Sequence, residues 1–455
     1  MPEQSYDVVV VGGGTAGFAA ARTAARSGAS VALIEANILG GECPNTACVP
    51  TKALLASAGI LEETQHGAPF GVHCPRLRGE FGEAVRREQQ VVQAGGSETD
   101  VERRLQSQGI RVARGRAQLL SDRLLAVDGD RLRAERIILC TGTTDSPPPV
   151  AGLAEIGYLT HKEAILLPSA PDSLAILGGG PVGVEFAQIF APFGTKVTLI
   201  ERNFCALSKE DQEITDTICN YLRQAGITVD THVTITRAVR RHGLKVLQGT
   251  RCGHPYEVAA EEVLSAVGHQ PALEDMGLER AGVEWDGGGI RVDDTLRTHS
   301  PRVWAAGDCT GIAHYTHVAA YQGRLAARNA LSDNPLPADH RVVPRVTFTR
   351  PEVASVGLTE AQARESYRNV RAGRIDLAEI EKARIEGEQR GMAKLVLGED
   401  DRILGAHIIA PRAGELIHEP ALAMAAGIPA RQMGAMMHAF PTFSEIWEAL
   451  LLRMH

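Results

Sequence analysis

One strand–turn–helix–strand pattern occurs twice in the chain, and it constrains the fold more than any other feature. The first copy runs from YDVVVVGGGTAG to SVALIE, and the second runs from SLAILGGGPVG to KVTLIE. The glycines and closing acids are Gly12, Gly14, Gly17 and Glu35 in the first copy, and Gly178, Gly180, Gly183 and Glu201 in the second. In both copies the acid follows the first glycine by 23 positions. The pattern predicts an α/β fold that contains two Rossmann-like units.

The chemistry of this pattern is that of a dinucleotide site. The first glycine permits the tight turn, the second lets the backbone approach a pyrophosphate, and the third lets helix and strand pack closely. The pyrophosphate sits at the helix N-terminus, and the acid accepts hydrogen bonds from ribose hydroxyls. A single glycine-rich turn is weak evidence, but two complete copies argue against coincidence. The chain is therefore predicted to bind two dinucleotides.

Length and charge narrow the class of protein further. At 455 residues the chain is too long for one hydrophobic core, so several domains are expected. The formal net charge is -8 and no long basic run occurs, so nothing favours nucleic acid or an anionic membrane surface. The start, MPEQSYDVVVVGGG, lacks a basic segment followed by a cleavable apolar segment, and its apolar run is too short to span a bilayer. We expect a cytoplasmic protein.

Two of the eight cysteines, Cys43 and Cys48 in LGGECPNTACVPTKALL, form the one close pair. The others are expected to be mostly reduced core residues and not a disulfide framework. Five positions correspond to about 7.5 Å along a regular helix, whereas the Cα atoms of a disulfide lie about 4.4–6.8 Å apart. The segment must therefore leave regular helical geometry, and Pro44, Asn45 and Pro50 are suitable distorting residues.

Three chemistries are open to this pair. Two buried structural thiols are the simplest, and a zinc site is disfavoured because no second ligand pair of suitable spacing accompanies it. A helix start and the nearby Lys52 favour a thiolate, which points to redox chemistry. Because the pair directly follows the first glycine motif, we assign FAD to the first motif and a nicotinamide cofactor to the second. The segment RVWAAGDCTG, in which Asp308 ends a strand, supports this order.

The segment GGECPNTACVPTK resembles the GGTCxNxGCxPSK signature of the class I pyridine nucleotide–disulfide oxidoreductases, such as dihydrolipoamide dehydrogenase, glutathione reductase and mercuric reductase. The likeness covers essentially the whole chain, through ILCTGT, AVGHQP, AAGDC and HAFPTFSE. It implies an FAD-binding domain at 1–150 and 271–335, an NAD(P)-binding domain at 151–270 and a C-terminal α+β dimer-interface domain at 336–455. It also implies a homodimer in which the C-terminal segment completes the active site of the other subunit.

The resemblance also implies roles for individual residues. Cys48 faces the flavin as the charge-transfer thiolate, and Cys43 attacks the substrate. Lys52 lies near the flavin N5 and pairs with Glu185. Glu35 holds the adenosine ribose of FAD, Asp308 binds the ribityl chain, and the backbone near His317 lies close to the isoalloxazine. The further cofactor-binding positions are Ala117, Thr141, Gly142, Val233 and Gly268.

NADH is the expected nicotinamide cofactor, with NADPH possible. Relatives that use NADPH often carry Ala at the position of Gly183, and the Glu201 carboxylate would repel a 2′-phosphate. Arg202 opposes this assignment, because NADPH-using relatives place a phosphate-binding Arg there. We interpret Arg202 as a surface residue.

The sequence departs from the family in HAFPTFSE. Phe440 stands where relatives carry the acid–base His, while Glu445 remains. Phe carries no proton, so ordinary acid–base catalysis is in doubt, and His438 is expected to point elsewhere. The expected activity passes electrons from NAD(P)H through FAD and the cysteine pair to a small disulfide, dithiol or metal-ion acceptor. The alternatives are thiolate chemistry on a non-disulfide substrate, or a redox-sensing, electron-donating partner of another protein.

Overall fold

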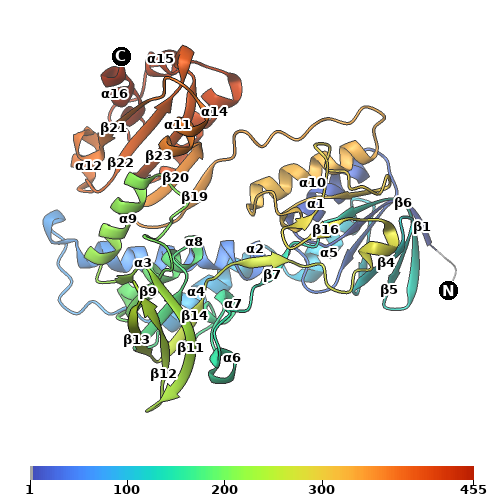
Figure 1. Ribbon diagram of the computed structural model, residues 1–455, viewed down its shortest axis with the longest axis horizontal. Helices are drawn as coiled ribbons and strands as arrows, with labels where there is room; N and C mark the ends of the chain where they lie inside the picture. The colour runs from blue at the N-terminus through green and yellow to red at the C-terminus, as the bar shows by residue number, and fades with distance from the viewer. Residues whose placement is uncertain (1–3) are drawn as a thin grey trace. The chain divides into compact units, whose positions relative to one another are not determined.

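The computed structural model describes residues 4–455, and these divide into two compact units (Figure 1). The first unit comprises the chain up to Pro50, Arg87–Pro147 and Gly268–Asp339. The second comprises Thr51–Arg86, Pro148–Val267 and His340–His455. Both units mix helices and sheets, which confirms the α/β class predicted from the two glycine motifs. Within the described residues, no helix is long and apolar enough to cross a membrane.

The first compact unit is built on a twisted sheet whose centre is parallel. Its strands are β1 (Gln4–Val11), β2 (Val31–Glu35), β3 (Ile110–Arg114), β4 (Ala117–Ser121), β5 (Leu124–Val127), β6 (Asp130–Leu139) and β18 (Val303–Ala305). The order is β3-β2-β1-β6-β5-β4, and β18 pairs with β6. β2 is buried along its whole length, as expected for a parallel strand covered on both faces. Helices α1 (Thr15–Arg26) and α10 (Thr316–Ala330) pack against each other beside this sheet (Figure 1).

The second compact unit contains a smaller parallel sheet of order β10-β9-β8-β14. Its strands are β8 (Ser173–Leu177), β9 (Lys196–Ile200), β10 (Thr228–Asp230) and β14 (Glu262–Ser265), and its main helices are α8 (Pro181–Phe190) and α9 (Gln212–Gln224). An antiparallel sheet of β11 (Val233–Arg241), β12 (Leu244–Arg251) and β13 (His254–Ala260) adjoins it. The repeat of strand, glycine turn, helix and strand thus recurs in both compact units.

The C-terminal part of the second unit forms a five-stranded antiparallel sheet of order β19-β20-β23-β22-β21. These strands are β19 (Arg345–Thr347), β20 (Glu352–Gly357), β21 (Arg371–Asp376), β22 (Met392–Leu397) and β23 (Ile403–Ala410). Helices α14 (His418–Ala426) and α16 (Glu445–Met454) complete its core, and Trp447 of α16 is fully buried. Large apolar side chains are nevertheless exposed in this part, among them Leu422, Met437 and Phe440.

A buried ion cluster joins α9 to this antiparallel sheet. The ammonium group of Lys394, on β22, lies 2.8 Å from a carboxylate oxygen of each of Asp211, Glu213 and Glu360. Burial works against ionisation of Asp211, but hydrogen bonds from Lys394 and from the Glu360 backbone N–H outweigh it and lower the pKa of Asp211. The cluster therefore anchors the N-terminal end of α9.

Candidate active site

The two glycine motifs have the same local geometry. Helix α1 follows Gly14 and helix α8 follows Gly180, and in neither case does a side chain cap the helix N-terminus. The first N–H groups of both helices can therefore bind an anion such as a pyrophosphate. An added Cβ would lie 2.2 Å from the Cys140 carbonyl oxygen at Gly12 and 2.4 Å from that of Ala266 at Gly178. Only glycine fits at these turns.

Each closing acid holds its own turn. The Glu35 carboxylate accepts hydrogen bonds from the N–H groups of Gly13 and Asn37, both at 2.6 Å. The Glu201 carboxylate accepts from Gly179 and Asn203, both at 2.7 Å. Carboxylate oxygens have further lone pairs, so ribose hydroxyls can bind to the same groups. The uncapped helix N-termini, the glycine turns and the carboxylates of Glu35 and Glu201 are suited to binding FAD and a nicotinamide dinucleotide.

The cysteine segment lies directly on the first of these turns. A Cβ at Gly41 would meet the Cα of Gly14 at 2.9 Å, so the two backbones pass in close contact. Helix α2 (Glu42–Asn45) ends before Cys48, where α3 (Cys48–Gln65) begins, and non-helical residues separate the two helices. The segment thus leaves regular helical geometry, as the spacing of the two cysteines predicts.

Cys43 and Cys48 share one hydroxyl group. The Oγ1 of Thr316 lies 3.3 Å from the Cys43 sulfur, to which it donates, and 3.5 Å from the Cys48 sulfur. Cys48 is the first residue of the 18-residue helix α3, and Thr316 is the first residue of the 15-residue helix α10. Helix N-termini favour negative charge, so both helices support a thiolate at this point.

Charged groups around Asp308 lie in the same compact unit. Burial raises the pKa of Asp308, while His314 and His269 lower it and Glu42, beside the first cysteine, raises it. The ring of His317 stacks on that of Tyr315 with 5.4 Å between centroids. Asp308, the residue expected to meet the flavin ribityl chain, is therefore a partly buried acid whose pKa is raised above its usual value.

The expected pair of Lys52 and Glu185 is present. The Lys52 Nζ lies 2.7 Å from Glu185 Oε2, and the Glu185 side chain is only 5% exposed. The other Glu185 oxygen accepts from the Phe348 N–H at 3.0 Å, and the Lys52 ammonium lies 4.7 Å from the centroid of the Phe348 ring. Glu185 and Phe348 together fix the position of the ammonium group.

The segment around Phe440 offers no proton carrier at that position. Phe440 is 73% exposed in the single chain. The His438 ring lies 2.9 Å from a Glu419 oxygen and 3.3 Å from a Glu448 oxygen, so it is held within its own domain. The Glu445 carboxylate accepts from the Thr442 N–H at 2.8 Å.

The remaining predicted cofactor positions lie at the first residue of a strand or in a loop between strands. The Val233 N–H donates to the Glu201 carbonyl at 3.0 Å, and Ala117 is a buried residue at the start of β4. The Gly142 carbonyl accepts from the Ala272 N–H, and Thr141 precedes it just after β6. Gly268 has a φ of 114°.

The expectation for the other cysteines is partly wrong. Cys205 and Cys219 form a disulfide in the second compact unit, and Cys74 and Cys252 are exposed and not part of a core. Among the described residues, only Cys140 and Cys309 are buried thiols, and burial raises the pKa of Cys309 to about 11. The pairing of Cys205 with Cys219 depends on the packing of α9 against the preceding loop, which residue spacing does not reveal.

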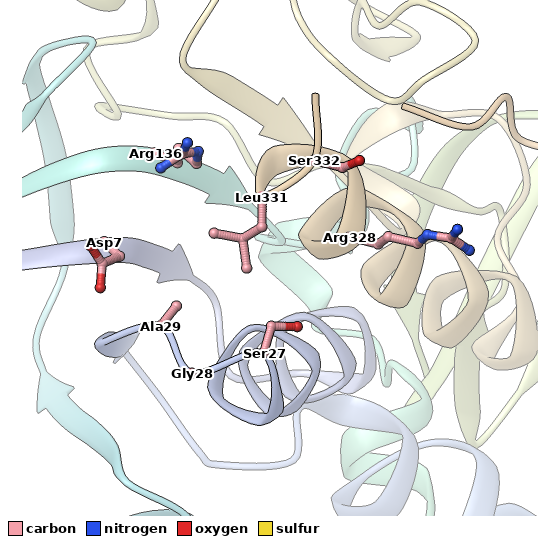
Figure 2. Close-up of a pocket in the computed structure, with 8 residues that line it drawn as sticks. All are labelled: Asp7, Ser27, Gly28, Ala29, Arg136, Arg328, Leu331 and Ser332. Atoms are coloured by element: carbon pink, nitrogen blue, oxygen red, sulfur yellow. The ribbon is translucent and has the colours of Figure 1, made fainter. Parts of the chain in front are cut away.

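A cavity of about 410 Å³ lies away from the cysteines, between the ends of α1 and α10 (Figure 2). Asp7, Arg136 and Arg328 are among its lining residues. The Asp7 carboxylate is already bound by the Ser30 N–H and hydroxyl. Neither the cysteine segment nor the glycine turns at Gly12 and Gly178 contribute a residue to its lining.

Comparison with known proteins agrees with this geometry. A family profile described as "Pyridine nucleotide-disulphide oxidoreductase" matches residues 6–323, and a profile for the dimerisation domain of the same family matches residues 343–450. The chain belongs to the pyridine nucleotide-disulphide oxidoreductases. It is therefore a flavin-dependent oxidoreductase that acts on a sulfur group with NAD(P), and its C-terminal part is a dimerisation domain.

The similar proteins span more than one activity. The chain is 36% identical to a mercuric reductase of Streptomyces lividans, covering 97% of this chain and 94% of that protein. It is 33% identical to a dihydrolipoyl dehydrogenase of Bacillus subtilis, covering 98% of each. The solved structure described as the Cu(II) complex of HOCl-induced flavoprotein disulfide reductase RclA from Escherichia coli matches with a TM-score of 0.87, 29% identity and 100% coverage of both chains.

Two residues of the site were not predicted from the sequence. Thr316 is 268 positions from Cys48, and Phe348 is 163 positions from Glu185. Neither belongs to a motif with its own chemistry, although Thr316 directly precedes His317, which the family resemblance places near the flavin. Only the tertiary structure brings these side chains to the cysteines and to Lys52.

Proposed function

We propose that the chain is an NAD(P)H-dependent reductase whose cysteine pair delivers electrons to a soft metal ion. FAD would occupy the first glycine motif and the nicotinamide cofactor the second, with NADH preferred because the Glu201 carboxylate repels a 2′-phosphate. The observation that carries the choice of acceptor is Phe440, which replaces the acid–base group needed for exchange with a disulfide.

Proton transfer distinguishes the two kinds of acceptor. In disulfide exchange, the attacking thiol loses a proton and the leaving thiolate gains one, so a positioned acid–base group accelerates the reaction. In reduction of a thiolate-bound metal ion, two electrons leave the sulfurs of Cys43 and Cys48, and a disulfide forms between them. One Hg(II) becomes Hg(0), or two Cu(II) become Cu(I), and no bond to hydrogen forms on the acceptor. Phe440 impairs the first reaction and not the second.

The described side chains have defined tasks in this proposal. Thiolates bind soft metal ions, and the N-termini of α3 and α10 stabilise thiolates at Cys43 and Cys48. The Thr316 hydroxyl donates to the Cys43 sulfur and lies 3.5 Å from the Cys48 sulfur, so it can stabilise a thiolate in this pair. Glu185 and Phe348 position the Lys52 ammonium. When bound, FAD supplies two-electron transfer between the nicotinamide and the cysteine pair.

The names of two similar proteins support a metal acceptor. One is a mercuric reductase, and the RclA structure is described as a Cu(II) complex. We further propose a homodimer through the dimerisation domain, with domains at 1–150 and 271–335, at 151–270 and at 336–455. The exposed Leu422, Met437 and Phe440 supply apolar surface for such an interface.

The test compares acceptors in steady-state oxidation of NADH. We expect Hg(II) or Cu(II) to be reduced faster than lipoamide or glutathione disulfide. The variant Phe440→His should raise disulfide turnover about 10²-fold or more, the usual contribution of an acid–base group, and leave metal reduction unchanged. Phe440→Leu is the matched control and should gain nothing. Rapid turnover of a small disulfide by the native protein, unaltered in Phe440→His, would refute the proposal.

A further inference from the structure

The Cys205–Cys219 disulfide has no part in the site described above. Cys205 lies in the loop between β9 and α9, Cys219 lies in α9, and their Cα atoms are 6.6 Å apart. Disulfides are uncommon in reducing compartments, where those that form are mostly catalytic or redox-sensing. We propose that this disulfide is a redox-sensitive site that sets the affinity of the second glycine motif for its nicotinamide cofactor. The inference rests on the proposed function insofar as that motif holds the nicotinamide cofactor.

The loop that carries Cys205 forms one wall of the second glycine motif. The Leu207 N–H donates to the Gly179 carbonyl at 2.8 Å. A Cβ at Gly179 would lie 3.2 Å from the Cα of Ala206, so loop and turn are in close contact. The same loop begins at Glu201, the acid placed to bind the ribose. A shift of Cys205 therefore reaches the nucleotide site through its two following residues.

The other side of the disulfide is fixed. Helix α9, which carries Cys219, is held at its N-terminal end by the ion pairs of Asp211 and Glu213 with Lys394. The Lys394 side chain is only 4% exposed. The loop before α9 is held at its far end, where Glu210 pairs with Arg345 and accepts a hydrogen bond from Ser355. The stretch around Cys205 is therefore the part that moves when the sulfurs separate.

Reduction would force that movement. A dithiol donates two electrons and two protons, the S–S bond breaks, Cys205 and Cys219 become thiols, and the dithiol becomes a cyclic disulfide. Bonded sulfurs are about 2 Å apart, whereas non-bonded heavy atoms need about 3.5–4 Å. Both cysteines are buried in the same apolar cluster as Ile214 and Ile218, so close packing opposes the extra separation.

The expected consequence is weaker nicotinamide binding in the reduced protein. Disrupting one hydrogen bond such as that from Leu207 to Gly179 corresponds to about a fivefold loss of affinity. Linkage is reciprocal, so bound cofactor should make the disulfide harder to reduce by the same factor. A dithiol thus lowers activity at limiting cofactor, and a small-molecule disulfide restores it by the reverse exchange.

The experiment uses the full-length, FAD-loaded protein with Cys43→Ser and Cys48→Ser, so that a dithiol acts on no other close pair. Alkylation under denaturing conditions followed by mass spectrometry identifies the cysteines protected before reduction. Calorimetric titration with NAD⁺ then gives the dissociation constant before and after dithiothreitol. We expect Cys205 and Cys219 to be protected and the dissociation constant to rise about fivefold on reduction.

Two further variants serve as checks. Adding Cys205→Ser should reproduce the weaker binding and abolish the response to dithiothreitol, whereas adding Cys252→Ser, an exposed thiol, should change neither. If Cys205→Ser does not fold, the change in the NAD⁺ dissociation constant when the parent protein is reduced still tests the inference. Full alkylation of Cys205 and Cys219 without reduction, or NAD⁺ binding that does not respond to reduction, overturns the inference. Absence of NAD⁺ binding in both redox states overturns the assignment of the second motif as well.

Discussion

The two glycine motifs share one backbone design and differ in the segment after the closing acid. In both, this segment returns to the turn: the Gly40 N–H donates to the Gly13 carbonyl in the first motif, and the Leu207 N–H donates to that of Gly179 in the second, each at 2.8 Å. Both segments then lead to a cysteine pair. After the first motif the thiols are half-buried beside Thr316, and after the second they form a disulfide inside the core.

This difference indicates that the glycine turn, helix N-terminus and closing acid determine which ligand can bind. The segment that follows the acid determines the environment of the cysteines. In the first segment α2 ends at Asn45 and α3 begins at Cys48. The Cys48 sulfur therefore lies at a helix N-terminus and close to the Thr316 hydroxyl group. The second segment runs into the side of α9, where apolar neighbours surround Cys219. The same residue type forms a pair of half-buried thiols in one place and a buried cross-link in the other.

The largest expected effect separates the two cysteine pairs. Cys48→Ser should lower metal-dependent oxidation of NADH by about 10³-fold or more, a loss typical of removing a catalytic residue, because electrons then have no path from the flavin to the cysteine pair. Cys219→Ser should retain turnover at saturating cofactor. The measurement is the steady-state rate of NADH oxidation by each variant with Hg(II) as the acceptor. A Cys219→Ser protein as inactive as Cys48→Ser would break the comparison.

The next effect distinguishes the two glycine motifs. An added Cβ would lie 1.8 Å from the Gly12 carbonyl at Gly17 and 1.9 Å from the Gly178 carbonyl at Gly183, so Ala forces the backbone apart at either site. Gly17→Ala should weaken flavin binding, and Gly183→Ala should weaken nicotinamide binding while the flavin stays, each by about 10- to 100-fold. The flavin content of the purified protein measures the first effect, and titration with NAD⁺ measures the second. Gly287→Ala, in open space, is the control. Loss of flavin from Gly183→Ala would contradict the assignment.

A smaller effect concerns Thr316. Thr316→Val keeps the shape of the side chain but removes the hydroxyl that contacts both sulfurs. A hydrogen bond to a charged group favours the thiolate, so the pH midpoint of the long-wavelength thiolate–flavin band should rise by about one unit. Anaerobic titration with NADH across pH detects this shift. Thr316→Ser should behave as the native protein, and an unchanged midpoint in Thr316→Val would remove Thr316 from the site.

The smallest effect is on stability in acid. Burial opposes ionisation of Asp211, yet hydrogen bonds from Lys394 and a backbone N–H lower its pKa overall. A depressed carboxyl pKa gives stability that is present above the unfolded value, about 4, and is lost as the pH falls through the folded value. The free energy of unfolding measured with urea should therefore fall below about pH 4. Lys394→Met should make the free energy of unfolding depend less on pH in this range. Arg241→Gln, which removes the exposed pair with Glu257, should not.

Much of the fold could be predicted from local sequence. Strand, glycine turn, helix and acid are contiguous, so the two motifs are readable from spacing and residue type. The break between α2 and α3 followed from the separation of Cys43 and Cys48. The pairing of Lys52 with Glu185 came through the family resemblance, because 133 positions separate the two residues.

Contacts between distant segments could not be predicted in this way. Thr316 and Phe348 reach the site only through tertiary packing, and neither has an unusual local context. Cys205 and Cys219 look like two ordinary apolar positions, since their partnership depends on how α9 packs against a loop. Spacing constrains neighbours along the chain, and a long-range pair needs the packed core to define it.

The closing acids have one further consequence. Both oxygens of Glu35 and both of Glu201 already hold backbone N–H groups, so each turn has its final shape before any nucleotide arrives. The conformational entropy of ordering these loops is thus spent during folding and not during binding. A protein built this way should survive removal of its flavin with its turns intact, and it should reload without a slow conformational step.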